Sequence, residues 1–219
     1  GASRTLGLTG EDAPGLMPAV DYIKTLRQTD DLGSLAVAKR CIVIGAGNTA
    51  IDMATQMARL GAAEVTLVYR RGVEAMSATD HEQEIAKANG VRMITWAQPD
   101  EILLNEQGQV AGMRFAKTQE QAGQLTATGD TFEIAGNAIF KAIGQGFAGE
   151  SLRDATAAEL ARDGERIHVN QMFQTSLPNV YAGGDCVKPG QDLTVQAVQH
   201  GKLAAHAIHQ SLAAQQEAA

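Results

Sequence analysis

Gly45, Gly47 and Ala50 have the spacing G-x-G-x-x-A, found in turns that hold the pyrophosphate of a dinucleotide. Gly45 lets the backbone turn tightly, Gly47 leaves no Cβ in the path of a pyrophosphate, and Ala50 lets a helix pack closely on a strand. Asn48 and Thr49 lie at the expected helix N-terminus, where free N–H groups attract anions. We therefore predict that these five residues bind a cofactor. An ordinary tight strand-to-helix turn is the alternative.

The segments on either side of this turn are those that dinucleotide binding requires. Cys41–Ile44 is a short, β-branched apolar run, typical of a strand buried on both faces. After the turn, apolar residues recur at helical spacing up to Gly61, which can end a helix. The inward face of this helix consists of Ile51, Ala54, Met57, Ala58 and Leu60.

Arg70 and Arg71 follow a second predicted strand, Glu64–Tyr69, whose end lies where the adenine ribose of a bound dinucleotide would sit. An acidic residue roughly 20 positions past the glycines favours NAD, whereas guanidinium groups suit the 2′-phosphate of NADP. The arginine pair therefore favours NADP. Two solvated surface arginines are the alternative.

The rest of the chain predicts an α/β core interrupted by a small antiparallel meander. Glu101–Leu104 and Gln109–Lys117 form a hairpin with which Thr131–Ile134 can pair, and the polar stretch 119–129 is an expected exposed loop. A loop at 9–16, helices at 21–29, 78–89 and 192–212, and strands at 91–96, 138–143 and 165–169 are also predicted. On the last helix, the residues expected to face inward are Val195, Val198, Leu203, Ala207 and Ile208.

Composition excludes several classes of protein. The 219 residues are 44% hydrophobic and 20% charged, which is typical of a soluble globular protein. The net charge of −7 disfavours nucleic acid and anionic membranes as partners. No apolar run reaches the roughly 18 residues of a membrane helix. Two distant cysteines, Cys41 and Cys186, favour a reduced, cytoplasmic setting.

Together with Gly10–Gly15, Phe140–Gln145 and Val180–Asp185, the glycine turn and the arginine pair are specific to one superfamily in this order and spacing. The chain resembles the C-terminal part of the NAD(P)H–FAD reductases related to the glutamate synthase small subunit and to the flavin module of dihydropyrimidine dehydrogenase. This resemblance covers essentially all 219 residues. It implies a Rossmann-like NAD(P)H-binding domain at 12–143, nested in the second half of an FAD-binding domain formed by 1–11 and 144–219.

The resemblance also implies flavin contacts in the final third of the chain. In such proteins the aspartate at the position of Asp185, preceded by Gly184, hydrogen-bonds the ribityl or diphosphate side of FAD. Thr194 and Val195 open a helix whose N-terminus faces the pyrimidine edge of the flavin, where the reduced flavin gains negative charge. Taken alone, Gly183–Asp185 is equally compatible with a simple turn and a capping aspartate.

Two family features do not occur in this sequence: the earlier glycine-rich turn for the ADP half of FAD, and a cysteine-rich iron–sulfur region. We therefore expect an excised fragment with an incomplete FAD site, which binds FAD weakly or not at all. Relatives that use NADPH commonly carry another basic residue shortly after the arginine pair. Residues 73–81 contain no arginine or lysine, so NAD stays open and NADP is only slightly preferred.

The implied reaction is hydride transfer from the nicotinamide C4 to the flavin N5, with electrons passing on to iron–sulfur centres or a catalytic partner subunit. Such a transfer needs proximity and stacking, so no catalytic residue is predicted. Gly144 and Gln145 follow a buried strand and are candidate contacts near the nicotinamide. Lys141 and Asp52 have simple structural roles available. The histidines His168, His200, His206 and His209 show no metal-binding spacing.

Three other functions stay open. An electron-input subunit of dihydropyrimidine dehydrogenase would use a similar flavin module with a different partner chain. A regulatory module would bind a nucleotide without turnover. A disulfide reductase shares the nested architecture but requires a redox cysteine pair, and Cys41 and Cys186 form no C-x-x-C motif.

Overall fold

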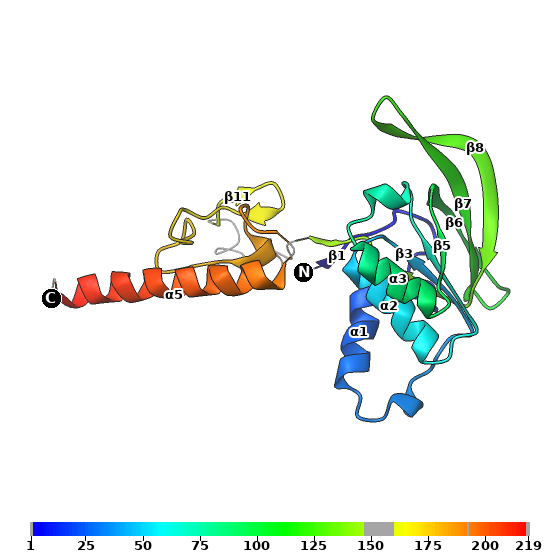
Figure 1. The fold of residues 1–219 in the computed structure, drawn as a ribbon, viewed down its shortest axis with the longest axis horizontal. Helices are drawn as coiled ribbons and strands as arrows, with labels where there is room; N and C mark the ends of the chain where they lie inside the picture. Colours follow the sequence, from blue (N-terminus) through cyan, green and yellow to red (C-terminus); the bar gives the residue numbers. More distant parts are fainter. Residues whose placement is uncertain (1, 147–159, 192, 218–219) are drawn as a thin grey trace. The chain divides into compact units, whose positions relative to one another are not determined.

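The computed structural model describes residues 2–146, 160–191 and 193–217, with a few side chains near the end of this range left out. These residues form two compact units (Figure 1). The sheet unit is Ser3–Gly144, and the terminal unit consists of the described residues outside that range. The sheet unit is therefore inserted within the sequence of the terminal unit. The predicted assignment of one cofactor to each domain stays a prediction.

A five-stranded parallel sheet forms the centre of the sheet unit, in the order β2-β9-β3-β4-β5. In that order the strands are Leu16–Pro18, Ala138–Lys141, Arg40–Ile44, Glu64–Val68 and Arg92–Ile94. Strand β2 was not expected, because its three residues are too few to show a pattern and include a proline, which is confined to edge strands such as this one.

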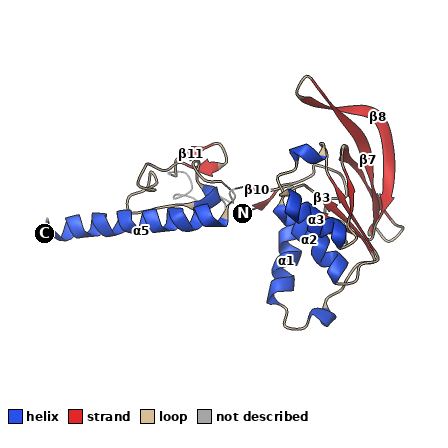
Figure 2. Ribbon diagram, viewed as in Figure 1, coloured by secondary structure: helices blue, strands red, loops and turns tan. Residues whose placement is uncertain are grey.

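Three helices, α1 (Ala19–Gln28), α2 (Asn48–Arg59) and α3 (Asp80–Ala88), cover one face of this sheet (Figure 2). Side chains alternate along β3, so Cys41 and Val43 pack against the helices while Ile42 and Ile44 belong to a second core on the opposite face. The predicted strands, turn and helix around Gly45 are thus confirmed. The expected helix at 78–89 is confirmed as α3, which begins with a reciprocal capping box between Thr79 and Glu82.

The opposite face of the sheet is covered by an antiparallel meander of β6 (Ala97–Leu104), β7 (Val110–Gln121) and β8 (Gln124–Ala135). The predicted loop at 119–129 is wrong. Here β7 and β8 pair as far as Gln121 and Gln124, around a turn at Ala122 and Gly123 with φ of 50° and 78°. Between residues 119 and 129 both faces of the ladder are largely polar and exposed, so the alternation that marks a half-buried strand is missing.

The terminal unit contains β11 (Arg162–Asp163), β12 (Arg166–Ile167) and α5 (Thr194–Glu217). The two-residue strands β1 (Ala2–Ser3) and β10 (Gln145–Gly146) pair with each other. A short 3₁₀ turn occurs in the terminal unit at Gly184–Cys186, and two more occur in the sheet unit at Leu32–Ser34 and Val73–Ala75. The predicted start of the last helix at 192 lies outside the described residues.

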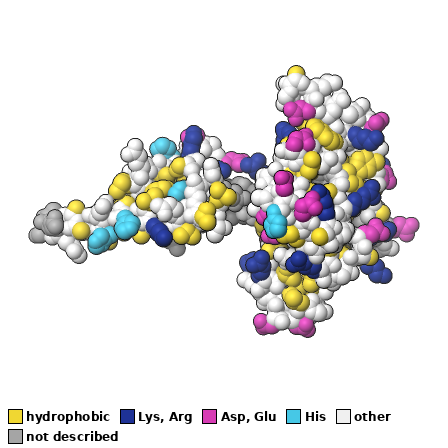
Figure 3. All heavy atoms as spheres, viewed as in Figure 1, with side chains coloured by type: hydrophobic (Ala, Val, Ile, Leu, Met, Phe, Trp, Pro, Cys, Tyr) yellow, Lys and Arg dark blue, Asp and Glu magenta, His cyan; other side chains and the backbone are white. Residues whose placement is uncertain are grey.

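The expected inward face of α5 is wrong within the described part of the chain, except at Ala207, which is buried. Val195 is 77% exposed and Val198 is 55% exposed, and Leu203 and Ile208 are also exposed. Hydrophobic side chains are visible on the surface of this unit (Figure 3). Helical spacing shows which residues share a face, but it does not show whether another segment covers that face.

Candidate functional site

Three loops meet at the carboxyl edge of the parallel sheet. They follow β3, β4 and β9, which are neighbours, and comprise Gly45–Thr49, Tyr69–Gly72 and Ala142–Gly144. The amide of Gly45 donates to Val68 O at 3.0 Å, and the amide of Ala142 donates to Ile44 O at 2.8 Å. Ligands of open α/β sheets bind outside this edge. The sequence-predicted residues of the sheet unit therefore gather at one place.

Gly45 is fixed by its own backbone and by its neighbour. Its φ of +144° is rarely adopted by other residues, and a Cβ at this position would collide with Ala142 O. Gly47 differs, because its φ is −94° and a Cβ would lie 3.2 Å from Ser77 Oγ, an exposed side chain. The protein itself therefore demands a glycine at Gly45 much more strongly than at Gly47.

The N-terminus of α2 points its first amides out of the turn. Gly47 caps the helix without a side-chain hydrogen bond, and its carbonyl accepts from Ala50 N at 2.9 Å and Ile51 N at 3.2 Å. Asn48 is exposed and Thr49 is half-buried, and the amides of a first helical turn have no intrahelical acceptor. Ala50 is fully buried in the core beneath the helix. This arrangement presents N–H donors and a helix dipole to an anion.

The loop after β4 carries the arginine pair, with Arg70 exposed and Arg71 half-buried. An acidic group that sequence reasoning missed lies beside it: the 3₁₀ turn at Val73–Ala75 brings the Glu74 carboxylate against the Cα of Gly72. Ser77 was missed as well, although it approaches Gly47 and is followed by Ala78, whose amide donates to Ala46 O at 3.0 Å. The sequence alone does not show that Glu74 lies beside Gly72 or that Ser77 lies beside Gly47, because both contacts depend on the fold of residues 73–78.

The carboxyl end of β9 is tied to the N-terminal loop. Lys141 makes an ion pair with Glu11, and their side chains are only 9% and 12% exposed. Glu11 also accepts from the amides of Leu6 at 2.8 Å and Gly7 at 3.0 Å. Burial alone would raise the pKa of Glu11, but Lys141 and the two amides outweigh it and lower that pKa. The structural role expected for Lys141 is confirmed, and Asp52 is exposed on α2.

Gly144 ends the sheet unit, with a φ of +93° and with its carbonyl accepting from Arg4 N at 3.2 Å. Gln145 is exposed and belongs to the terminal unit. Both follow β9 by a few residues, as expected from the sequence.

The candidate flavin residues lie in the terminal unit, where Gly183 and Gly184 pack against α5. Gly184 has a φ of +87°, and a Cβ on Gly183 would lie 2.8 Å from His200 Cβ. His200 is buried and its Nδ1 accepts from Gly184 N at 3.1 Å, which requires Nδ1 to be unprotonated. The centroid of its imidazole ring lies 4.5 Å from the centroid of the Phe173 ring. Sequence reasoning gave His200 no role, because its partner is sixteen residues away.

Asp185, Thr194 and Val195 are all exposed, so their polar groups and the start of α5 are open to a ligand. Residues of the described ranges contain no group of three or more His, Cys, Asp or Glu side chains placed to hold a metal ion. In the same ranges, no helix is both long and apolar enough to span a bilayer.

Both cysteines are free thiols. Cys41 is 2% exposed in β3, and burial raises its pKa to about 11. Cys186 is half-buried, and burial followed by the nearby Asp185 charge raises its pKa too. Neither thiol has the lowered pKa of a reactive cysteine.

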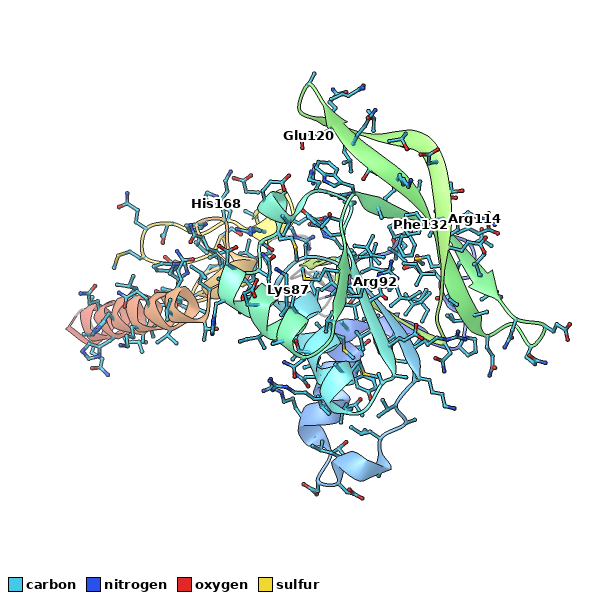
Figure 4. The ribbon with its side chains drawn as sticks, turned by 45° about the vertical axis from the view of Figure 1, so that its right-hand side comes forward. Lys87, Arg92, Arg114, Glu120, Phe132 and His168 are labelled. Carbon is cyan, nitrogen blue, oxygen red and sulfur yellow. The ribbon has the colours of Figure 1, made fainter. Side chains whose placement is uncertain are left out.

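A surface hollow of about 400 Å³ lies beside the arginine loop rather than at the glycine turn. Residues from β5, from the meander and from the link between them line it, among them Trp96, Lys117 and Thr118. Figure 4 labels two more of its lining residues, Arg92 on β5 and Phe132 on the meander.

A family model described as pyridine nucleotide-disulphide oxidoreductase matches residues 1–201. The chain belongs to this family. The resemblance predicted from the sequence motifs and the α/β fold class are both confirmed.

Three relatives are similar over most of the chain. The glutamate synthase [NADPH] small chain of Escherichia coli is 31% identical over 92% of this chain and 46% of its own length. The NADP(+)-dependent formate dehydrogenase subunit beta of Moorella thermoacetica is 34% identical over 96% and 30%. The NAD-dependent dihydropyrimidine dehydrogenase subunit PreT of Salmonella typhimurium is 30% identical over 92% and 43%. The chain thus spans less than half the length of each of these relatives.

Two solved structures share the fold. Thioredoxin reductase of T. acidophilum has a TM-score of 0.74 at 21% identity, covering 96% of this chain and 62% of that protein. Mycobacterium tuberculosis FprA in complex with NADPH has a TM-score of 0.68 at 18% identity, covering 99% and 63%.

Proposed function

We propose that this chain provides the pyridine nucleotide site of a flavin-dependent oxidoreductase. In this proposal NAD(P)H delivers a hydride to FAD, and electrons pass on to iron–sulfur centres or to a catalytic partner subunit, as in the glutamate synthase small subunit. The observation that supports it most strongly is the meeting of the glycine turn, the arginine loop and the end of β9 at one edge of the sheet.

The sheet unit fits a dinucleotide in its local geometry. The absence of a side chain at Gly45 and the small, buried side chain of Ala50 let the turn pack closely on the ends of β3 and β9. Gly47 is the N-cap of α2, so the first amides of this helix follow it directly. We infer that Gly47, Asn48 and Thr49 bind the pyrophosphate through these amides. We infer that Arg70 and Arg71 contact the adenine ribose, or its 2′-phosphate in NADP.

The cofactor choice stays with NADP or NAD. Guanidinium groups favour a 2′-phosphate, whereas the Glu74 carboxylate beside Gly72 opposes one. The relatives differ as well, since their names pair one with NADPH, one with NADP(+) and one with NAD.

In the terminal unit we propose that Gly184 and Asp185, with Thr194 and Val195 at the start of α5, form part of an FAD site. The exposed Asp185 carboxylate can accept hydrogen bonds from hydroxyl groups, and the helix N-terminus favours negative charge. When bound, the flavin supplies the hydride acceptor; the residues of this chain bind and orient it.

A disulfide reductase receives no support from the thiols of this chain. Cys41 is enclosed in the core of the sheet unit, and its raised pKa opposes formation of the thiolate. An electron-input role in a dihydropyrimidine dehydrogenase is the second candidate, favoured by the similarity of 92% of the chain to the dihydropyrimidine dehydrogenase subunit PreT.

Anaerobic stopped-flow reduction of the flavin in the parent flavoprotein tests the proposal. We expect NADPH or NADH to bleach the flavin absorbance. We expect Gly47→Ala to raise the nucleotide concentration at which the rate of flavin reduction is half-maximal. Binding of nucleotide without any bleaching would favour a regulatory module instead. Assay of the reduced protein with glutamate synthase or dihydropyrimidine dehydrogenase partner chains separates the two candidate pathways.

A further inference from the structure

The arginine loop is hydrogen-bonded to the segment where the meander begins, at Trp96 and Ala97. Beyond the last paired residue of β4, the amide of Ala97 donates to Tyr69 O and the amide of Trp96 donates to Arg71 O, both at 3.0 Å. Trp96 and Ala97 lie where the chain leaves β5 and enters β6. Two carbonyls that flank the first arginine are therefore bonded to the meander.

Thr118 supplies the third bond, to the carbonyl of Arg70 itself. Its Oγ1 donates to Arg70 O at 2.7 Å, and its amide donates to Trp96 O at 2.9 Å. Thr118 is only 5% exposed, and it joins residues 48 positions apart in the sequence. Thr118 thus links the arginine loop and the Trp96 backbone in one hydrogen-bonded cluster.

Two irregular backbone features place Thr118 and Trp96. The β7–β8 register shifts between Ala116 and Thr118, and such irregularities redirect the side chains of a strand. Trp96 has a φ of +58°, a left-handed conformation that is unusual for a large residue and persists only where its surroundings hold it. Strained residues of this kind gather where a neighbouring site needs a fixed geometry.

We propose that Thr118 is a positioning residue that sets the preference for nucleotides bearing a 2′-phosphate, by fixing the backbone from which Arg70 and Arg71 project. This role rests on the proposed function. Two guanidinium groups bind a phosphate well only when their backbone is fixed beforehand, because ordering it on binding would offset the affinity gained. Arg70 is an exposed residue, so without the Thr118 bond its carbonyl can rotate toward water and move the arginine side chain away from the ligand.

Thr118→Val removes the hydroxyl at nearly constant shape, and Thr118→Ser keeps it. Calorimetric titration of each chain with NADPH and NADH is the test. We expect Thr118→Val to weaken NADPH binding about three- to tenfold, with NADH within about twofold, and Thr118→Ser to restore most of the preference. Thr126→Val is the matched control, because Thr126 also donates to a meander carbonyl, Gln119 O, but this hydrogen bond is exposed and distant in sequence from the arginine loop.

Three results would overturn this role. They are an unchanged NADPH-to-NADH preference in Thr118→Val, an equal loss for both nucleotides, or failure of serine to rescue. Thr118→Ala replaces the valine variant if the latter does not fold, and it is expected to lose the same preference. If the unsubstituted chain binds neither nucleotide, the proposed function fails first and this role fails with it. Normal binding by the unsubstituted chain with an unaltered preference in the variants would contradict the positioning role alone.

Discussion

Gly45 and Gly47 occupy equivalent places in a sequence motif but have different physical duties. At Gly45 a side chain meets both a left-handed φ and the carbonyl of Ala142. At Gly47 the backbone is extended and the nearest neighbour of a Cβ is an exposed serine hydroxyl. One glycine serves the fold, and we propose that the other serves the ligand.

We therefore expect Gly45→Ala to lower the free energy of unfolding by about 1–3 kcal/mol from backbone strain alone. Gly47→Ala is expected to change stability by less than about 1 kcal/mol while weakening nucleotide binding about tenfold. Urea unfolding followed by the fluorescence of Trp96, the single tryptophan of the chain, measures the first effect in the sheet unit. Equal stability losses in both variants would contradict this division of duties.

Glu74 introduces a negative charge beside the arginine loop. Because a carboxylate repels a 2′-phosphate, Glu74→Gln is expected to strengthen NADPH binding several-fold relative to NADH, and more so at low salt. Titration with both nucleotides at two ionic strengths measures this. Glu106→Gln, in the turn between β6 and β7, is the distant control. The idea fails if both nucleotides respond alike to Glu74→Gln.

At the scale of elements, the Glu11–Lys141 pair joins the N-terminal loop to the end of β9. The folded pKa of Glu11 is lowered from 4.5, so its stabilisation is complete above that pH and is lost as the pH falls through the folded pKa. Glu11→Gln should therefore cost about 2 kcal/mol at neutral pH and progressively less as the pH falls below 4.5. Unfolding by urea over a series of pH values on both sides of 4.5 measures the difference, with the exposed-pair variant Glu84→Gln as control. A cost independent of pH would argue against the ion pair.

Buried central elements could be predicted from sequence because their signals are local. Cys41–Ile44 is a continuous apolar run that ends at Gly45, and the strand from Glu64 is rich in apolar and β-branched residues, so local sequence identifies both as buried strands. The distal part of the β7–β8 ladder could not, because Gln119 and Gln124 are polar and this part lies mostly in solvent, whereas the predicted pairing of Thr131–Ile134 with the preceding strand is confirmed. The exposed face of α5 shows the converse, since an apolar pattern alone does not show what covers it.

The candidate site divides in the same way. Gly45, Ala50 and Arg71 were placed by their spacing within one strand–helix–strand unit, so their proximity follows from chain order. Thr118 and His200 could not be found, because each acts through a hydrogen bond to a residue remote in sequence. Glu74 is close in sequence, but only its 3₁₀ turn directs it toward Gly72.

At the scale of the whole molecule, we predict that the isolated 219-residue chain retains little FAD, because it contains one glycine-rich dinucleotide turn and spans less than half the length of its relatives. The visible absorbance of the purified chain measures bound flavin. Stoichiometric flavin on the isolated chain would show that Gly184, Asp185 and the start of α5 suffice for binding.

We propose that the carboxyl edge of the parallel sheet binds a pyridine nucleotide. Calorimetric titration of the 219-residue chain with NADPH and with NADH, in parallel with the Gly47→Ala variant, tests this binding. We predict saturable binding of at least one nucleotide at a single site, weakened about tenfold in Gly47→Ala while the protein stays folded. Absence of binding by the unsubstituted chain, or equal affinity in the variant, would contradict the claim.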